Sequence, residues 1–598
     1  MDDVHDQPSV TGRQRLLGAA AVIVVGTCAY ANSFHGPFVF DGVPKIVENR
    51  AIRELWPPWG WLGFNRRPVA YFSFAVDYAV YGHEPIGPSS AELDTRGWHA
   101  TNLAIHLGAG LVLLGIVYRT LSKGRLAKRY GHDAHLLALG VALIWVVHPL
   151  QTQSVTYVVQ RIESLMGLLY LLTLGAFVAA WGSSHSRSWY AVSVGACALG
   201  MATKEVAVTA PLVVLFYDRI FVAGSWREIV QKRNRYYIAL FGTWTILGFL
   251  LVSRWSITSG HAGVVAGLSP IQYAQSQPGV IAHYLRLCCV PLSQCLDYWW
   301  PVAETASEIV PPTVLIIVLL GATGWCLGRC PPAGFLGLWF FLILAPTSSI
   351  MPIKDIAFEH RMYLPLAAAV TAFVIGGYEF SRRKLGVGPR GWLLCVVPVV
   401  IVVLAGLTLA RNASYQSQLS VWRDVTRKAP HNPRAFLNLG EALDQAGQTR
   451  EALDCYLEVL RVDARYARID IVYSNMGIIY HESGDVGRAM ANYNKALQIN
   501  PSYAKGHTNL AIALIKLGKL DDALPHFERA VSLEPENAEF HTNFGQALKN
   551  ARRLDEAVGH FRRALELDPR YERARKNLEK LGAPRRTSVL EGASAGVS

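Results

Sequence analysis

Charged and polar residues lie at the ends of long apolar segments, where a lipid phosphate and a hydroxyl group could meet. They are Asp41, Arg67, His99, His106, His148, Arg161, Lys204, Glu205, Glu359, His360 and Arg361. Ionisable residues at membrane depth are costly and usually face a protein cavity. Arg and Lys beside a bilayer suit an anionic headgroup, and a carboxylate at the same depth can accept a proton from a hydroxyl. These residue types predict a polar site at one membrane face, with ordinary loop solvation as the alternative.

The composition requires a membrane part. The chain has 598 residues, a net charge of +13, 51% hydrophobic residues and 17% charged residues, where soluble domains carry about 25% charged residues. Disorder, collagen and a small disulfide scaffold are excluded. The nine cysteines form no CxxC pair; Cys288, Cys289 and Cys295 are the one group that could form a disulfide, and we expect none.

Motifs for soluble donors are missing from the sequence. It contains no GxxxxGK[ST] and no GxGxxG, so a sugar or phosphate donor would be lipid-borne rather than a cytosolic nucleotide. The positive charge follows the connections between apolar segments, and no nucleic-acid module is visible. We therefore expect membrane lipid, and no nucleic acid, among the partners.

The apolar runs predict an all-α, multispanning membrane domain over 16–410. A bilayer core needs about 20 apolar residues per helix, and eleven segments qualify: 16–32, 99–120, 134–150, 163–181, 189–203, 206–222, 236–253, 311–329, 333–351, 362–380 and 391–410. Segment 278–292 is broken by polar residues and proline, and we interpret it as re-entrant or interfacial. The first span is predicted to be an uncleaved anchor, with a signal peptide as the alternative.

Basic connections set the predicted orientation. Lys and Arg concentrate in 119–129, 227–235 and 382–390, which follow even-numbered spans. By the positive-inside rule, the amino-terminal segment 1–15 is cytoplasmic, and the large loop 33–98 and the carboxyl-terminal part are outside. Outside means the periplasm of a bacterial inner membrane, our preferred location, or the ER lumen in a eukaryote.

The carboxyl-terminal part repeats with a period of 34 residues. Gly440, Gly477, Ala511 and Gly545 share one position, Ala452, Ala489, Ala523 and Ala557 a second, and Tyr456, Tyr493, Phe527 and Phe561 a third. This is the tetratricopeptide pattern. We predict a linker over 411–432, four repeats with a capping helix over 433–582, and a disordered tail over 583–598. Such repeats usually bind a peptide or protein along a concave face, and a rigid spacer is the alternative.

Several strings in the membrane part resemble one family. They are FVFDGVPKIVENRAI (38–52), WHATNLAIHL (98–107), HPLQTQSVTYVVQR (148–161), TKE (203–205) and EHRMYLP (359–365). Together with the repeats that follow, they resemble the transmembrane and tetratricopeptide-repeat O-mannosyltransferases and their bacterial relatives. That family belongs to the C-type (GT-C) glycosyltransferases, which use polyprenyl-phosphate sugars.

The resemblance implies an inverting sugar transfer to a protein hydroxyl at the outer face, with mannose as the family's sugar. Asp41 would be the general base, and Arg161, Lys204 and Arg361 would bind the donor phosphate. Candidates for orienting the substrates are His148, Glu205, Glu359, His360, Arg67, His99 and His106. Relatives commonly carry two acidic residues at the Asp41 position, whereas this chain has Asp41-Gly42, which puts its activity in question.

Some alternatives stay open from the sequence. No cofactor is predicted with certainty; a divalent cation on Asp41 and Glu205 is an option that no ligand spacing supports. A non-catalytic scaffold that presents the repeats, and a transporter of lipid-linked sugars, are the rival functions. The sugar and the acceptor cannot be read from the sequence.

Overall fold

The computed structural model describes residues 11–56, 67–82, 94–253, 268–349, 352–353, 355–384 and 389–582. Within these residues the secondary structure is entirely helical, which confirms the predicted all-α class. The chain divides into two compact units, Met1–Pro430 and His431–Ser598. The predicted tail 583–598, most of the predicted amino-terminal segment 1–15, and parts of loop 33–98 lie outside the described residues.

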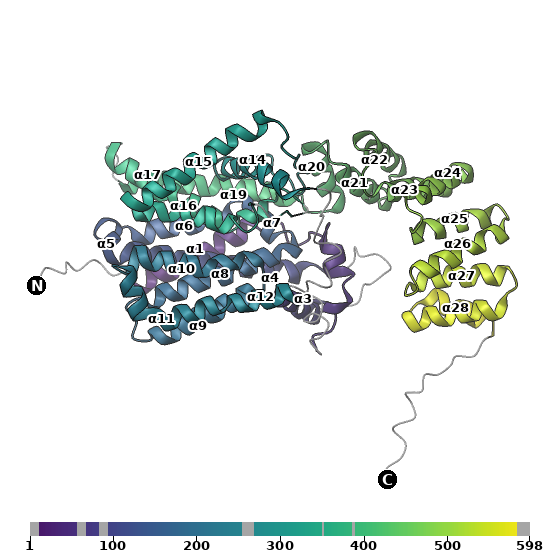
Figure 1. Cartoon of the computed structure of the whole chain (residues 1–598), viewed down its shortest axis with the longest axis horizontal. Coiled ribbons are helices and arrows are strands. Elements are labelled where there is room, and N and C mark those ends of the chain that lie inside the picture. Colours follow the sequence, from purple (N-terminus) through teal and green to yellow (C-terminus); the bar gives the residue numbers. More distant parts are fainter. Residues whose placement is uncertain are drawn as a thin grey trace, which may run out of the picture. The chain divides into compact units, whose positions relative to one another are not determined.

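Long helices of the first unit run alongside one another (Figure 1). The described α-helices of this unit, long and short, are α1 Gly12–Ala29, α3 Pro68–Tyr81, α4 Arg96–Ser122, α5 Gly124–Tyr130, α6 Ala134–Val147, α7 Thr152–Val155, α8 Arg161–Ala180, α9 Ser186–Met201, α10 Ala210–Tyr217, α11 Trp226–Gly242, α12 Trp244–Val252, α14 Pro270–Cys289, α15 Ala306–Arg329, α16 Pro331–Leu344, α17 Pro365–Lys384, α18 Pro389–Gly391, α19 Val397–Ala413 and α20 Gln418–Lys428. Every predicted span coincides with a helix or a broken helical segment.

Five helical segments are by themselves long and apolar enough to cross a membrane, as judged over the described residues. They are Arg96–Ser122, Val158–Ala180, Trp226–Val252, Ala306–Arg329 and Trp392–Ala413. A sixth arises if α5 and α6, bent by 96°, are one span. These helices support a membrane protein, whereas the number of eleven spans stays a prediction. Predicted span 206–222, for example, has only the eight-residue α10 as regular α-helix.

The core of the first unit is built on small residues that let helices approach closely. A Cβ added to Gly26 of α1 would lie 2.4 Å from Leu107 of α4, and one added to Gly110 of α4 would lie 2.5 Å from Val146 of α6. Small residues at such crossings allow tight packing where no hydrophobic force drives association between helices in lipid. Helix α6 is accordingly buried on nearly all sides.

Apolar side chains also cover the outside of this unit. No residue of α15 is buried, and its Val314, Ile317 and Val318 are more than half exposed. A helix face on which neighbouring apolar side chains are all exposed marks contact with lipid or another apolar surface. This exposure agrees with a membrane location for α15.

Helices of the second unit form pairs that follow one another along the chain (Figure 1). The pairs are α21 Pro433–Gln445 with α22 Thr449–Val462, α23 Ile469–Glu482 with α24 Val486–Ile499, α25 Ala504–Lys516 with α26 Leu520–Leu533, and α27 Ala538–Asn550 with α28 Leu554–Leu567, followed by the single helix α29 Glu572–Lys580. This arrangement confirms the predicted tetratricopeptide solenoid.

The small and aromatic positions of the repeat meet as the sequence predicts. A Cβ on Gly477 would lie 2.5 Å from the Tyr493 ring, and one on Gly440 would lie 2.5 Å from the Tyr456 ring. In the first, second and fourth pairs, the aromatic side chain of the second helix thus fills the space beside a glycine on the first, and in the third pair Ala511 takes the glycine's position.

We therefore expect Gly477→Ala to destabilise its repeat by about 1–3 kcal/mol, because the added methyl overpacks a closed site. Gly559→Ala in α28 is the control. Its Cβ meets nothing within 4 Å, so it should stabilise by about 0.5–1 kcal/mol. Hydrogen exchange of the intact protein, read at α23 and α24, measures the first effect. Equal protection of these helices in wild type and Gly477→Ala would contradict this packing.

Candidate functional site

Asp41 lies in a short loop after α1, and its carboxylate is 38% exposed. Its Oδ2 accepts a hydrogen bond of 2.5 Å from Lys45 Nζ, one helical turn further on. Its backbone N–H donates to the hydroxyl of Tyr157 at 2.8 Å. The side chain is thus fixed in place and still reaches solvent, as a proton acceptor requires.

Helix α20 packs against the loop that carries Asp41. Phe40 adopts φ +48°, a region that non-glycine residues rarely occupy without surrounding support. Its ring contacts Trp422 of α20 edge-on, with centroids 5.6 Å apart, and Gln418 Nε2 donates to Phe38 O at 3.1 Å. Contacts from α20 therefore hold the backbone conformation next to Asp41.

Two further cations at this end of the unit are paired with carboxylates. Arg67 donates to both oxygens of Glu205, at 3.1 and 3.2 Å, and both side chains are about one-third exposed. Lys204 forms a buried ion pair with Glu163. Burial is the largest single influence on Glu205 and opposes its ionisation, but the charges of Arg67 and Lys204 and the hydrogen bonds to the carboxylate together lower the pKa of Glu205. The Arg67–Glu205 pair is the more accessible of the two.

Arg161 is enclosed completely, with none of its side chain exposed. Its guanidinium donates to Asp77 Oδ2 at 2.5 Å, to Asn102 Oδ1 at 2.5 Å, and to the carbonyls of Ser73 and Trp98 at 3.2 and 3.0 Å. This network joins α3, α4 and the start of α8. In this arrangement Arg161 holds helices together, and its guanidinium does not reach solvent.

Arg361 is similarly occupied, by main-chain groups. It donates to the carbonyls of Asp355, Ile356 and Thr347 at 2.7, 2.8 and 3.2 Å. These bonds fix the segment before α17. The side chain is buried, and its bonds to these carbonyls hold the backbone of the segment in place.

His360, next to Arg361, has a defined tautomer. Its Nδ1 lies 3.1 Å from Gln153 Oε1, an acceptor, so Nδ1 carries the proton. Within the described part of the chain its Nε2 has no hydrogen-bond partner. Burial lowers the pKa of His360 well below its usual value, and the nearby charges of Lys204, Arg361, Arg67 and Lys45 lower it further. His360 is therefore neutral at pH 7 with an available acceptor nitrogen.

The charged residues that lower the pKa of His360 come from several separate segments of the chain. Lys45 beside Asp41, Arg67 in the long loop, Lys204 before α10 and Arg361 before α17 all act on one imidazole. Segments far apart in the sequence thus converge on His360. We call Asp41, Lys45, Arg67, Glu163, Lys204, Glu205 and His360 the polar site.

The three other predicted histidines bind backbone groups instead. His99 Nε2 contacts Gly36 O at 2.9 Å, His106 Nε2 contacts Val146 O at 3.0 Å, and His148 Nε2 contacts Cys288 O at 3.2 Å. In each case the ring nitrogen satisfies a carbonyl and links two segments. These residues stabilise the fold around the polar site.

Glu359 belongs to a second cluster, together with residues that the sequence did not single out. Its carboxylate accepts from Cys295 N at 2.7 Å and from the Tyr298 hydroxyl at 2.5 Å, and burial raises its pKa. Nearby, Asp424 of α20 accepts from Arg411 at 2.6 Å and from Lys428 at 2.8 Å. Glu359 and Asp424 are therefore anchoring groups.

The sequence identified most of the charged residues of the site but not the residues with which they pair. Lys45 has a signal, its spacing of four residues from Asp41, which suits a helical ion pair. Asp77 lies 84 residues before its partner Arg161, and nothing in the sequence links the two. Tyr157 was part of a recognised string but had no predicted role.

A divalent cation does not fit the carboxylates proposed for it. Asp41 is paired with Lys45 and Glu205 with Arg67, so each already has a counter-charge. Over the described residues, no group of three or more His, Cys, Asp or Glu side chains is placed to hold a metal ion. We assign no step to a metal.

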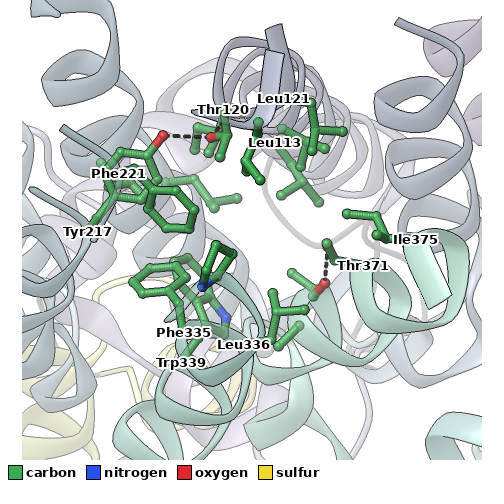
Figure 2. A pocket seen from close by; sticks show the side chains of 18 residues that line it. Leu113, Thr120, Leu121, Tyr217, Phe221, Phe335, Leu336, Trp339, Thr371 and Ile375 are labelled. Carbon is green, nitrogen blue, oxygen red and sulfur yellow. Dashed lines mark hydrogen bonds between the residues drawn. The ribbon is translucent and has the colours of Figure 1, made fainter. Parts of the chain in front are cut away.

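One pocket lies between α4, α8, α16 and α17 and has a different character (Figure 2). Leu113, Leu121, Phe335 and Leu336 point into it. Its few polar groups include the Thr120 and Tyr217 hydroxyls, which bond each other at 2.6 Å. No charged side chain lines it, so it suits a hydrocarbon rather than a reacting polar group.

The fold and site define a class: a helical protein whose apolar helices are followed by a tetratricopeptide solenoid. Family models described as tetratricopeptide repeat match 433–466, 477–518 and 508–576. Of the solved structures, that of MamA is 21% identical, with a TM-score of 0.23 over 26% of this chain and 88% of that chain.

Curated relatives extend the similarity beyond the repeats. Protein O-mannosyl-transferase TMTC4 of Homo sapiens is 24% identical over 499 residues, covering 73% of this chain and 65% of the relative. Protein O-mannosyl-transferase TMTC3 of Mus musculus is 22% identical over 531 residues, covering 81% and 53%. Matches of this length include much of the apolar unit, and they confirm the predicted resemblance to the tetratricopeptide-repeat O-mannosyl-transferases. The chain spans about two-thirds or less of the length of these relatives.

If α20 holds the Asp41 loop, Trp422→Ala should loosen it. Removing a fully buried Trp costs about 3–5 kcal/mol, and here the loss falls on the strained Phe40 backbone. We expect faster hydrogen exchange at the amides of 41–47 in the intact protein. Trp189→Ala is the control, because Trp189 of α9 is 40% exposed. Unchanged exchange at 41–47 in Trp422→Ala would rule out this role for α20.

Proposed function

We propose that the chain is a membrane glycosyltransferase that moves a sugar, mannose by family analogy, from a polyprenyl phosphate to a hydroxyl of a polypeptide. The observation that carries the proposal is the polar site. A half-exposed carboxylate, Asp41, is brought by converging segments near carboxylate-paired cations and a neutral histidine. The names of the relatives support the same reaction class.

The proposed reaction needs one base and one phosphate site. The acceptor hydroxyl attacks C1 of the sugar, its proton passes to Asp41, and the bond from C1 to the phosphate oxygen breaks with inversion. Polyprenyl phosphate leaves with the bonding electrons. Cations placed where charge develops on the leaving oxygen stabilise this transition state.

We assign the phosphate to Arg67, with Lys45 and Lys204 beside it. Arg67 is one-third exposed and can exchange its contact with Glu205 for a phosphate, and a guanidinium suits phosphate oxygens in bidentate geometry. The predicted phosphate roles of Arg161 and Arg361 are less favoured, because carbonyls and Asp77 occupy their donors. His360 Nε2 is placed to accept a hydrogen bond from a sugar or acceptor hydroxyl.

The proposed placement in the membrane follows from the predicted orientation of the spans. The polar site would lie at the outer face, with the amino terminus inside and the repeats in the periplasm or ER lumen, as the basic connections predict. The apolar pocket would accommodate part of a hydrocarbon chain. The repeats would bind the polypeptide acceptor.

Asp41→Asn should lower sugar transfer by at least about 100-fold, because a missing general base typically costs 10²–10⁴-fold. Transfer is measured with purified full-length protein, a labelled polyprenyl-phosphate mannose and unfolded polypeptide acceptors. Glu48→Gln, an exposed carboxylate on the same loop, is the matched control and should keep the wild-type rate. Full transfer by Asp41→Asn would refute the assigned base, and a wild type that neither transfers nor hydrolyses donor would favour the scaffold.

A further inference from the structure

Two histidine pairs join the helices of the third and fourth repeats. His507 of α25 faces His526 of α26, with their Nδ1 atoms 3.0 Å apart, and His541 of α27 faces His560 of α28, with their Nδ1 atoms 2.9 Å apart. Each pair links the first helix of a repeat to the second. The function proposed above gives these four residues no role.

The histidines occupy the same two positions in both repeats. They stand four residues before and fifteen residues after the small residue that each repeat shares. At these positions the second repeat has Tyr473 and Asn492, and the first repeat has Phe436 and Cys455. A helix pair of this solenoid can therefore pack without histidine there, and the second repeat offers a comparison within the same chain.

The first-helix histidine of each pair has a defined tautomer. Nε2 of His507 lies 3.0 Å from Pro501 O, and Nε2 of His541 lies 3.0 Å from Pro535 O. A carbonyl oxygen only accepts, so each Nε2 carries a proton, and Nδ1 of the neutral ring then has a free lone pair. The second-helix histidine must donate its Nδ1–H to that lone pair. Each pair therefore connects the turn before a repeat with both helices of the repeat.

The two rings of each pair point at each other. Their centroids are 5.3 Å apart in the third repeat and 5.2 Å apart in the fourth, so both Nδ1 atoms lie close to the line between the ring centres. This arrangement suits one hydrogen bond with a single shared proton. Two ligands of a tetrahedral or square-planar metal ion would instead converge on a point beside that line.

The shared hydrogen bond limits the number of protons that a pair can hold. A proton added to Nε2 of His526 leaves the bond in place, because Nδ1 still donates. A proton added to Nδ1 of His507 removes the acceptor and sets two positive rings against each other. The same holds for His541 and His560. The closed pair therefore holds at most one extra proton, whereas the separated histidines can each take one.

Burial opposes a positive charge on these rings. It is the largest influence on His526, His541 and His560 and lowers the pKa of each. The facing histidine lowers the pKa of His526 and His560 further. In the unfolded chain the pKa of histidine is about 6.5, and a group with a lower pKa in the folded chain loses stability as the pH falls below that value. Acid therefore favours opening of these two repeats.

Other charged and polar groups around the pairs modify this balance. Arg563 of α28 acts with burial to lower the pKa of His541, while the hydrogen bond to Pro535 O acts against it. Asp522 and Glu556 are exposed carboxylates one turn before the second-helix histidines, and they also act against burial. The net pKa is lowered in each case, so these groups do not reverse the response to acid.

We propose that the two histidine pairs make the third and fourth repeats sensitive to acid. Between about pH 7 and about pH 5, where histidine ordinarily takes up a proton, a second proton on a pair breaks its Nδ1–Nδ1 hydrogen bond and loosens α25 to α28. The first two repeats carry other residues at these positions and keep their packing. This response acts on the solenoid whether or not the apolar unit transfers sugar.

Hydrogen exchange of the full-length protein in detergent, corrected for the effect of pH on the intrinsic exchange rate, tests the response. Protection of α25 to α28 should fall at least about tenfold between about pH 7 and about pH 5, because each extra proton bound on opening shifts the equilibrium tenfold per pH unit. Protection of α23 and α24 should fall much less. The chelator EDTA at neutral pH should change neither.

A fourfold variant gives both repeats the Tyr and Asn that the second repeat has at these positions. It is His507→Tyr/His526→Asn/His541→Tyr/His560→Asn, and its α25 to α28 should lose the extra sensitivity to acid. His481→Asn in α23 is the control, because His481 belongs to neither pair. Its α25 to α28 should respond to acid as those of wild type do.

Four results would overturn the proposal. Three are equal protection of α25 to α28 at both pH values in wild type, an equally large fall in α23 and α24, and an unchanged acid response in the fourfold variant. The fourth is loss of protection with EDTA at neutral pH, because a metal ion rather than a shared proton would then join the rings. The comparison of helices within wild type needs no variant, so misfolding of the fourfold variant cannot obscure it.

Discussion

The burial of Arg161 is the constraint on which the end of the apolar unit that carries the polar site depends. A guanidinium without solvent contact is tolerated only if it is paired and well hydrogen-bonded, and Arg161 has Asp77 as its counter-charge and Asn102 and two carbonyls as further acceptors. The pairing draws α3 and α4 onto the first turn of α8. Two residues later, Glu163 pairs with Lys204 and fixes the segment before α10. The first turn of α8 thus positions α3, α4 and the segment before α10 together.

Helix α20 constrains the same region from the carboxyl-terminal side. Trp422 supports Phe40, the neighbour of Asp41, while Lys428 Nζ donates to Gln294 O at 2.7 Å, beside the segment that holds Glu359. The two loops of the polar site that carry Asp41 and His360 are therefore both braced by the last helix before the repeats in the chain. Rigid support of this kind is what a reacting constellation requires.

Local patterns predicted much of the fold, and the pairing of charges escaped prediction. The repeat positions of Gly477 and Tyr493 could be read directly, because they recur every 34 residues and their contact lies within one helix pair. Helical segments were found from apolar runs, although breaks such as the one around α10 keep the number of spans a prediction. Asp77 and Asp424 were missed as partners because only tertiary structure brings them to Arg161 and Arg411. For the same reason, the sequence favoured Arg161 as a phosphate ligand, although its side chain is enclosed and links helices. The more accessible Arg67 was predicted only to orient the substrates.

The central claim is that Arg67, which is one-third exposed and paired with Glu205, binds the lipid phosphate, rather than the enclosed Arg161. Binding of labelled undecaprenyl phosphate to the full-length protein in nanodiscs tests it most directly. Arg67→Gln should weaken binding by roughly tenfold or more, since a charge-assisted hydrogen bond contributes about 1.5–3 kcal/mol, whereas Arg129→Gln, which removes the ion pair of Arg129 with Glu379, should bind as wild type. Equal binding by wild type and Arg67→Gln would contradict the account.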